Sequence, residues 1–270
     1  SVKTLGGYAF FNTNALKTIN YNTGDVKSSY CYYKTSATDS SMVAIPSLEN
    51  GGNLSNQANI FSGTSVNNRK EITVNFNGTF VPSYLFSNGG RGFYSSNHSV
   101  PRIKVAKIAD SVEEIGDNAF SNCTELTNLT IGNGVKNGIK PVTFQKCKSL
   151  TTLSVNSNLQ DNAFRSRNST SSSYYFDKLT TITVGSSVKS IGNNAFAYNR
   201  YLTNLNYYAF DLTTSLTSSS NVFIGCGTSK TNGFSVNFGE GENIEIPAIE
   251  TSNIEKEKTW DDLFYYSKYW

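Results

Sequence analysis

A single histidine limits the catalytic chemistry open to this chain of 270 residues. His98 lies in the loop-like stretch 94–99. A serine or cysteine hydrolase with a histidine base would have to use it, and no Gly-x-Ser-x-Gly nucleophile motif accompanies it. One histidine also excludes zinc held by several histidines. We interpret His98 as a solvated loop residue and expect no catalytic residue, no metal site and no cofactor.

The four cysteines are widely spaced and form no Cys-x-x-Cys pair. Cys123, Cys147 and Cys226 each stand three residues after a phenylalanine, whereas Cys31 does not. A free cysteine packs well in a core, so we interpret these three as small buried residues. A disulfide between Cys123 and Cys147 stays open, since it requires their Cα atoms to lie within about 7 Å.

Four carboxylates form the densest acidic group of the chain: Asp110, Glu113, Glu114 and Asp117. Carboxylates bind calcium or act as an acid and base pair. The corresponding positions of similar segments elsewhere carry mostly lysine, threonine, serine and asparagine. The group is therefore interpreted as a solvated edge.

Those similar segments are internal repeats, which decide the fold when they are present. Residues 111–129 read SVEEIGDNAFSNCTELTNL and residues 187–205 read SVKSIGNNAFAYNRYLTNL, and residues 1–19 align with both without a gap. Looser copies cover 135–155 and 159–184. An L-x-x-L-x-I segment starts in turn at Ile103, Leu126, Leu150, Leu179 and Leu202. A longer unit, Asn59–Phe76, also recurs at identical spacing as Asn221–Phe238.

Each repeat carries the pattern of one strand with one buried face. Leu129 and Ile131 alternate with polar residues, and the apolar spacing in 118–123 suits a single helical turn. Strands that recur about every 23 residues must run parallel. Eight candidate strands, near residues 16, 72, 103, 126, 150, 179, 202 and 234, predict a sheet about 34 Å long. Phenylalanines in equivalent positions are expected to stack as a buried spine: Phe120, Phe144, Phe164 and Phe196.

The pattern I-G-x-x-A-F-x-x-C-x-x-L-x-x-L-x-I resembles the BspA-like leucine-rich repeats of exported and cell-surface bacterial proteins. We therefore expect an α/β fold: a right-handed leucine-rich-repeat solenoid with a parallel sheet on one face and short helical turns or irregular structure on the other. It is expected to span residues 1–250, with insertions near 22–58 and 166–175. Residues 251–270, rich in aromatic side chains, are expected to cap its end.

Composition narrows the function classes. Asn, Ser and Thr make up 96 of the 270 residues, while charged residues are only 16%, which excludes a coiled coil or helical bundle. The 13% of aromatic residues argues against disorder. The net charge of +3 is scattered, so we expect no nucleic-acid partner. No apolar run is long enough for a membrane-spanning segment.

Two regions are candidate ligand sites. The first is an uncharged strip of positions expected to face outward from the sheet: Thr127, Asn128, Thr130, Thr151, Thr152, Thr180, Thr181, Thr203 and Asn204. Threonine also suits a strand through its β-branched side chain alone, so a solvated sheet without a ligand is the alternative. The second region comprises the two insertions, where Tyr32 and Tyr174 could stack on sugars or anchor a protein, or instead pack within the fold.

These observations favour a non-enzymatic binding module, secreted or on the cell surface. The resemblance implies adhesion, and the expected partner is a host or cell-surface protein or a glycan, bound weakly over a wide area. The alternative is a structural spacer of a larger surface protein with no ligand of its own. A glycosidase-like enzyme is the third hypothesis. The identity of the ligand stays open.

Overall fold

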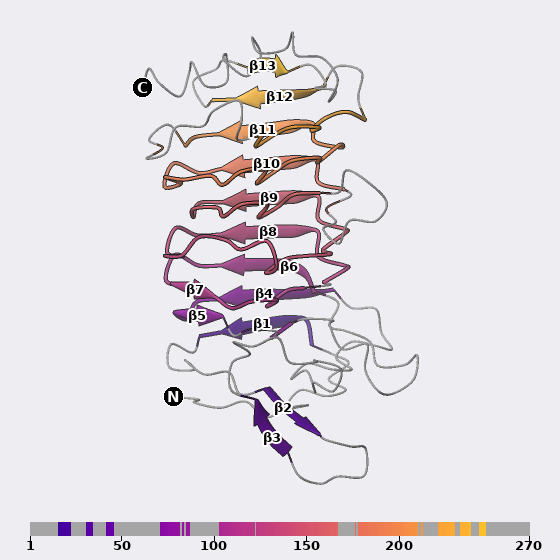
Figure 1. Cartoon of the computed structure of the whole chain (residues 1–270). Helices are drawn as coiled ribbons and strands as arrows, with labels where there is room; N and C mark the ends of the chain where they lie inside the picture. Colours follow the sequence, from indigo (N-terminus) through magenta and orange to yellow (C-terminus); the bar gives the residue numbers. More distant parts are fainter. Residues whose placement is uncertain are drawn as a thin grey trace.

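A nine-stranded sheet forms the body of the molecule in the computed structural model (Figure 1). The structure describes residues 16–22, 31–34, 42–45, 71–81, 83, 85–86, 103–121, 123–166, 176, 178–209, 212, 221–229, 233–238 and 243–246. The strands follow one another in the sheet in chain order: β1 (Thr18–Tyr21), β4 (Ile72–Phe76), β6 (Ile103–Ile108), β8 (Asn128–Ile131), β9 (Thr152–Val155), β10 (Thr181–Val184), β11 (Asn204–Tyr207), β12 (Phe234–Asn237) and β13 (Asn243–Ile246).

The first eight of these strands pair in parallel, which confirms the eight predicted strands, their order and their direction. Their register keeps equivalent residues side by side, so that Leu129 pairs with Leu153 and Leu153 with Ile182. β8, β9, β10 and β11 begin two residues later than their L-x-x-L-x-I motifs do, whereas β6 begins at the first residue of its motif, Ile103. Leu126 is fully buried at the corner before β8.

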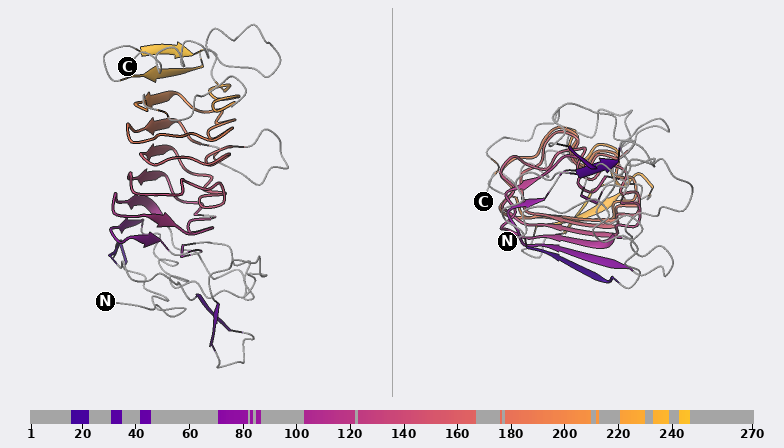
Figure 2. Two further views of the ribbon diagram at one scale, coloured as in Figure 1. Left: turned by 60° about the vertical axis from the view of Figure 1, so that its left-hand side comes forward. Right: turned by 90° about the horizontal axis from the view of Figure 1, so that it is seen from below.

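The sequence alternation sets which face of the sheet is buried. In β8 the side chains of Leu129 and Ile131 are buried, and those of Asn128 and Thr130 are exposed. Figure 2 shows the sheet on one side of the stack and the turns on the other. The apolar core lies between these two layers. A single repeat cannot bury its apolar residues alone, so the strands and turns of stacked repeats bury them together.

A column of phenylalanine rings runs through this core, as predicted. The ring of Phe120 stacks on that of Phe144 with centroids 5.0 Å apart, and Phe144 stacks on Phe164 at 5.8 Å. Phe196 follows Phe164 at 6.1 Å. The column is longer than expected, because Phe86 and Phe223 extend it at its two ends. All six rings are fully buried, so each repeat is held to its neighbours by aromatic contact.

The expected helical turns are not present in the described residues, where the segments before and after each phenylalanine are hydrogen-bonded turns and no helix occurs. The backbone explains why. The residue two before the phenylalanine is left-handed in Asn118, Asn162, Asn194 and Asn221, with φ between 50° and 61°. Asparagine tolerates this conformation better than most residues, and it interrupts a right-handed helix.

Three features lie outside the predicted stack. Strand β13 closes the described sheet by pairing antiparallel to β12. Strands β2 (Cys31–Lys34) and β3 (Met42–Ile45), within the expected insertion 22–58, form a separate antiparallel pair. Strands β5 (Phe80–Val81) and β7 (Glu114–Ile115) form a short parallel pair.

The expected cap, 251–270, lies outside the described residues. Within the described part of the chain, no helix is long and apolar enough to cross a membrane.

Candidate functional site: the exposed face of the sheet

The outward side chains of the sheet form two parallel rows, one residue per strand. The register of the strands defines the first row as Thr18, Thr73, Val105, Asn128, Thr152, Thr181, Asn204 and Ser235. The second row is Asn20, Asn75, Lys107, Thr130, Ser154, Thr183, Asn206 and Asn237. Neighbouring members of a row are about 4.8 Å apart, the spacing of paired strands. Lys107 is the one charged side chain in either row.

Five of the predicted site residues lie in these rows. Asn128, Thr130 and Asn204 are exposed, and Thr152 and Thr181 are half-buried. The structure therefore places them together on one surface of amide and hydroxyl groups. Such groups donate and accept hydrogen bonds in any direction along the face, and none of them carries a charge.

The other four predicted sheet residues lie outside the two rows. Thr127, Thr151, Thr180 and Thr203 precede their strands and are half-buried. Each hydroxyl donates to a backbone carbonyl of the preceding repeat: Thr127 to Lys104 at 3.1 Å, Thr151 to Thr127 at 3.1 Å, Thr180 to Thr151 at 3.2 Å and Thr203 to Thr180 at 3.0 Å. These four threonines join repeats. The constant Leu-Thr pair before each of these strands is the sequence signal for this role.

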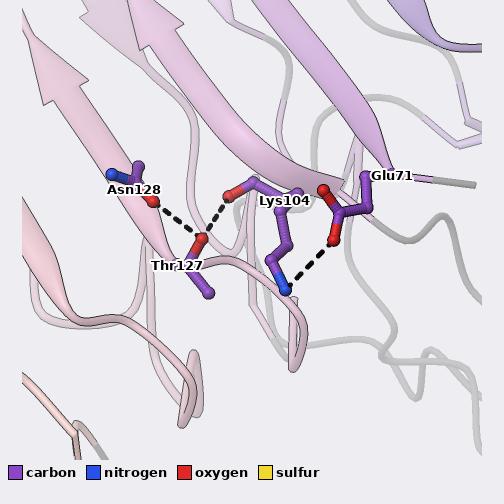
Figure 3. A network of polar contacts seen from close by, with 4 residues as sticks. All are labelled: Glu71, Lys104, Thr127 and Asn128. Atoms are coloured by element: carbon purple, nitrogen blue, oxygen red, sulfur yellow. Dashed lines mark hydrogen bonds and ion pairs between the residues drawn. The ribbon is translucent and has the colours of Figure 1, made fainter.

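At the start of β6, a bulge lies between Thr127 and a pair of charged side chains (Figure 3). Ile72 pairs with Ile103, but Thr73 pairs with Val105, so Lys104 is the extra residue of β6. Its Nζ lies 3.5 Å from a carboxylate oxygen of Glu71, and its carbonyl accepts from Thr127. The Thr127 hydroxyl is also 2.8 Å from Oδ1 of Asn128, so its single proton serves one of two acceptors.

Side chains within the rows also bond to one another across repeats. Asn75 Nδ2 donates to Asn20 Oδ1 at 2.9 Å, and Asn206 Nδ2 donates to Thr183 Oγ1 at 3.1 Å. A donor in one repeat thus meets an acceptor in the repeat before it. The pattern partly fixes the side chains that a ligand would meet, and a fixed side chain loses less entropy on binding.

Three carboxylates of the acidic group have partners in the next repeat. Lys136 Nζ lies 2.7 Å from a carboxylate oxygen of Glu113, and Lys140 Nζ lies 2.8 Å from Asp117. Asp110 Oδ1 accepts from the backbone N–H of Asn133 at 2.9 Å. Among the described residues, no three His, Cys, Asp or Glu side chains form a group that could hold a metal ion. These carboxylates stabilise the contact between repeats.

Cys123, Cys147 and Cys226 are free thiols in the core, which confirms their interpretation as buried residues. Cys123 Sγ donates to Phe86 O at 3.3 Å and Cys226 Sγ donates to Phe196 O at 3.1 Å. Burial raises the pKa of Cys123 well above its ordinary value, and raises that of Cys226 to about 12. A thiol that stays protonated is a poor nucleophile, so neither has the character of a catalytic cysteine.

The remaining candidates are placed as follows. Tyr32 lies in β2, outside the nine-stranded sheet, and His98 and Tyr174 lie outside the described residues. One exposed aromatic was not predicted: Tyr201 is 51% exposed. It lies in a turn of the repeat 187–205, at a position that the repeat pattern leaves variable, so the pattern does not mark it.

The sequence of the chain matches a known protein family. The model of the BspA type leucine rich repeat region matches six copies, over residues 92–226 and 169–256. The matched residues include β6 and every later strand of the sheet. No curated protein and no solved structure matches the chain.

Proposed function

The chain belongs to the BspA-type leucine-rich repeat family, and from this premise we propose that it is a non-enzymatic binding module that acts outside the cell or on its surface. Its role in this proposal is adhesion to a host or cell-surface protein or a glycan. A right-handed solenoid over residues 1–250 is part of the same proposal, since parallel crossovers are right-handed in nearly all proteins.

The observation that carries the proposal is the exposed face itself. The two rows place amide and hydroxyl groups at seven of the eight parallel strands of the sheet, and β6 contributes Val105 and Lys107, the single charge. Repetition at about 4.8 Å suits a ligand with its own regular polar groups, such as an extended peptide or a glycan chain. Each contact contributes little, so affinity is expected to depend on several copies binding at once.

A spacer without a ligand is the second candidate, and it rests on the side-chain bonds between repeats. Thr127, Thr151, Thr180 and Thr203 use their hydroxyls to join repeats, and so do the side chains of the acidic group. Such bonds resist bending of the stack. They serve a rigid binding surface equally well, so they support both candidates.

The test uses the full chain against a glycan array and a panel of immobilised host extracellular-matrix proteins. The variant Thr152→Arg with Thr181→Arg places two long charged side chains on the first row. Its matched control, Ser186→Arg with Asn193→Arg, adds the same charge at exposed turn positions. We expect binding by the parent chain and the control, and loss of at least tenfold in affinity by the sheet variant. Equal binding by all three would move the site off the sheet, and no binding by the parent would favour the spacer.

A further inference from the structure

Two of the buried thiols occupy the same position in adjacent repeats. Cys123 and Cys147 each follow a phenylalanine of the aromatic column by three residues, and those two phenylalanine rings are stacked at 5.0 Å. The backbones are bonded at this turn, because Phe120 N–H donates to Thr143 O at 3.0 Å. The two cysteines therefore stand one repeat apart along the stack.

A shared acceptor brings the two residues closer still. Phe120 O accepts from the Cys147 thiol at 3.2 Å and from the backbone N–H of Cys123 at 3.1 Å. Burial, and after it the neighbouring Cys147 side chain, raises the pKa of the Cys123 thiol. Equivalent residues of adjacent repeats are separated by about one strand spacing, about 4.8 Å. This separation lies within the Cα–Cα range of about 4.4–6.8 Å that disulfides require.

Cys226, the third buried thiol, has no cysteine at the equivalent position of the repeat before it. Cys226 follows Phe223, and the position equivalent to it in the repeat before is Asn199. Asn199 Nδ2 donates to Phe164 O at 3.0 Å, as the cysteines donate to the phenylalanine carbonyls before them. Cys226 is thus an internal control with the same burial and the same hydrogen bond.

We propose that Cys123 and Cys147 are a dithiol that closes to a disulfide between consecutive repeats when the chain folds in the presence of a small-molecule disulfide oxidant. One S–S bond forms and two S–H bonds break. The two electrons reduce the oxidant's disulfide, and its two thiols take up the two protons. Both thiols are at most 1% exposed. The exchange therefore takes place during folding, before the turns are packed.

The cross-link closes a loop of about 24 residues, which restricts the unfolded chain and raises the melting temperature. It gives up two thiol hydrogen bonds in exchange. Phe120 O keeps the backbone N–H of Cys123. The bridge would make the stability of the stack depend on the redox conditions under which the chain folded.

The test refolds the full chain from the reduced and unfolded state, with Cys31→Ser to leave the three buried thiols. One sample refolds with oxidised and reduced glutathione, and the other with dithiothreitol. After free thiols are alkylated, peptide mapping is expected to show a bridge between Cys123 and Cys147 and an alkylated Cys226. The oxidised sample should melt about 5 °C higher than the reduced one.

Cys147→Ser on the same background is the control, since serine keeps a donor for Phe120 O. It should show no bridge and no difference in melting temperature between the two samples. The proposal is overturned if Cys123 and Cys147 remain alkylated in the oxidised sample, if the bridge involves Cys226, or if the bridged chain melts at a lower temperature.

Discussion

Replacing Phe120 by alanine should remove one of the central packing contacts of the stack. Its ring is fully buried and lies 5.0 Å from Phe144, 5.5 Å from Phe86 and 5.9 Å from Phe76, measured between centroids. Truncation of a buried phenylalanine costs about 3 to 5 kcal/mol. Backbone hydrogen bonds of Phe120 to Thr143 and from Cys123 keep the surroundings from collapsing into the cavity, so the cost should be about 4 kcal/mol.

At about 2 to 4 °C per kcal/mol, this cost corresponds to a melting temperature lower by about 8 to 16 °C. Thermal unfolding followed by circular dichroism measures it. The control is Tyr201→Ala, also an aromatic-to-alanine change, at a side chain that is 51% exposed. It should change the unfolding free energy by less than about 0.5 kcal/mol. If the two variants melt within 2 °C of each other, the aromatic column does not hold the repeats together.

Three smaller perturbations test other parts of the structure. Thr151→Val should cost about 1 kcal/mol, because it removes a bond to the preceding repeat, whereas Thr130→Val on the exposed face should be nearly neutral in denaturant unfolding. Asn194→Ala should cost about 1 kcal/mol more than Asn194→Gly, because alanine is strained at a φ of 56°; equal stability would contradict this. Burial raises the pKa of Cys226 from 9.0 to about 12, so the unfolded state loses its proton first as the pH rises. The free energy of unfolding is therefore unaffected by this thiol below pH 9 and falls by about 1.4 kcal/mol per pH unit towards pH 12. Cys226→Ala should make this fall smaller in unfolding curves measured at alkaline pH.

The strands and the core were predictable because the same apolar pattern recurs in several repeats. Leu129 and Ile131 show the period of a strand, and the 23-residue interval between motifs requires parallel pairing. The phenylalanine of each repeat marks the aromatic column for the same reason. For the layer opposite the sheet, short helical turns or irregular structure were expected, and the described residues show irregular hydrogen-bonded turns. The apolar spacing around Phe120 agrees with a helix, but the left-handed Asn118 does not.

The candidate site was only partly predictable. The alternation placed Asn128 and Thr130 outward correctly. It did not reveal that Thr151 bonds to a carbonyl of the repeat before it, since that contact joins residues 24 apart in the chain. The antiparallel β13 also escaped prediction, because it ends the repetition on which the other strands were recognised. Contacts between repeats depend on how the repeats stack, and the sequence of one repeat does not specify this stacking.

The exposed rows, the threonines that join repeats and the pair of thiols all depend on the in-register stacking of consecutive repeats. Distances between spin labels measure that stacking directly. Labels at Asn128→Cys and Asn204→Cys are three strand spacings apart in the first row, and labels at Thr18→Cys and Asn204→Cys are six apart. The stack predicts backbone separations of about 14 Å and about 29 Å. Equal distances for the two pairs, or a Thr18 pair closer than the Asn128 pair, would contradict it.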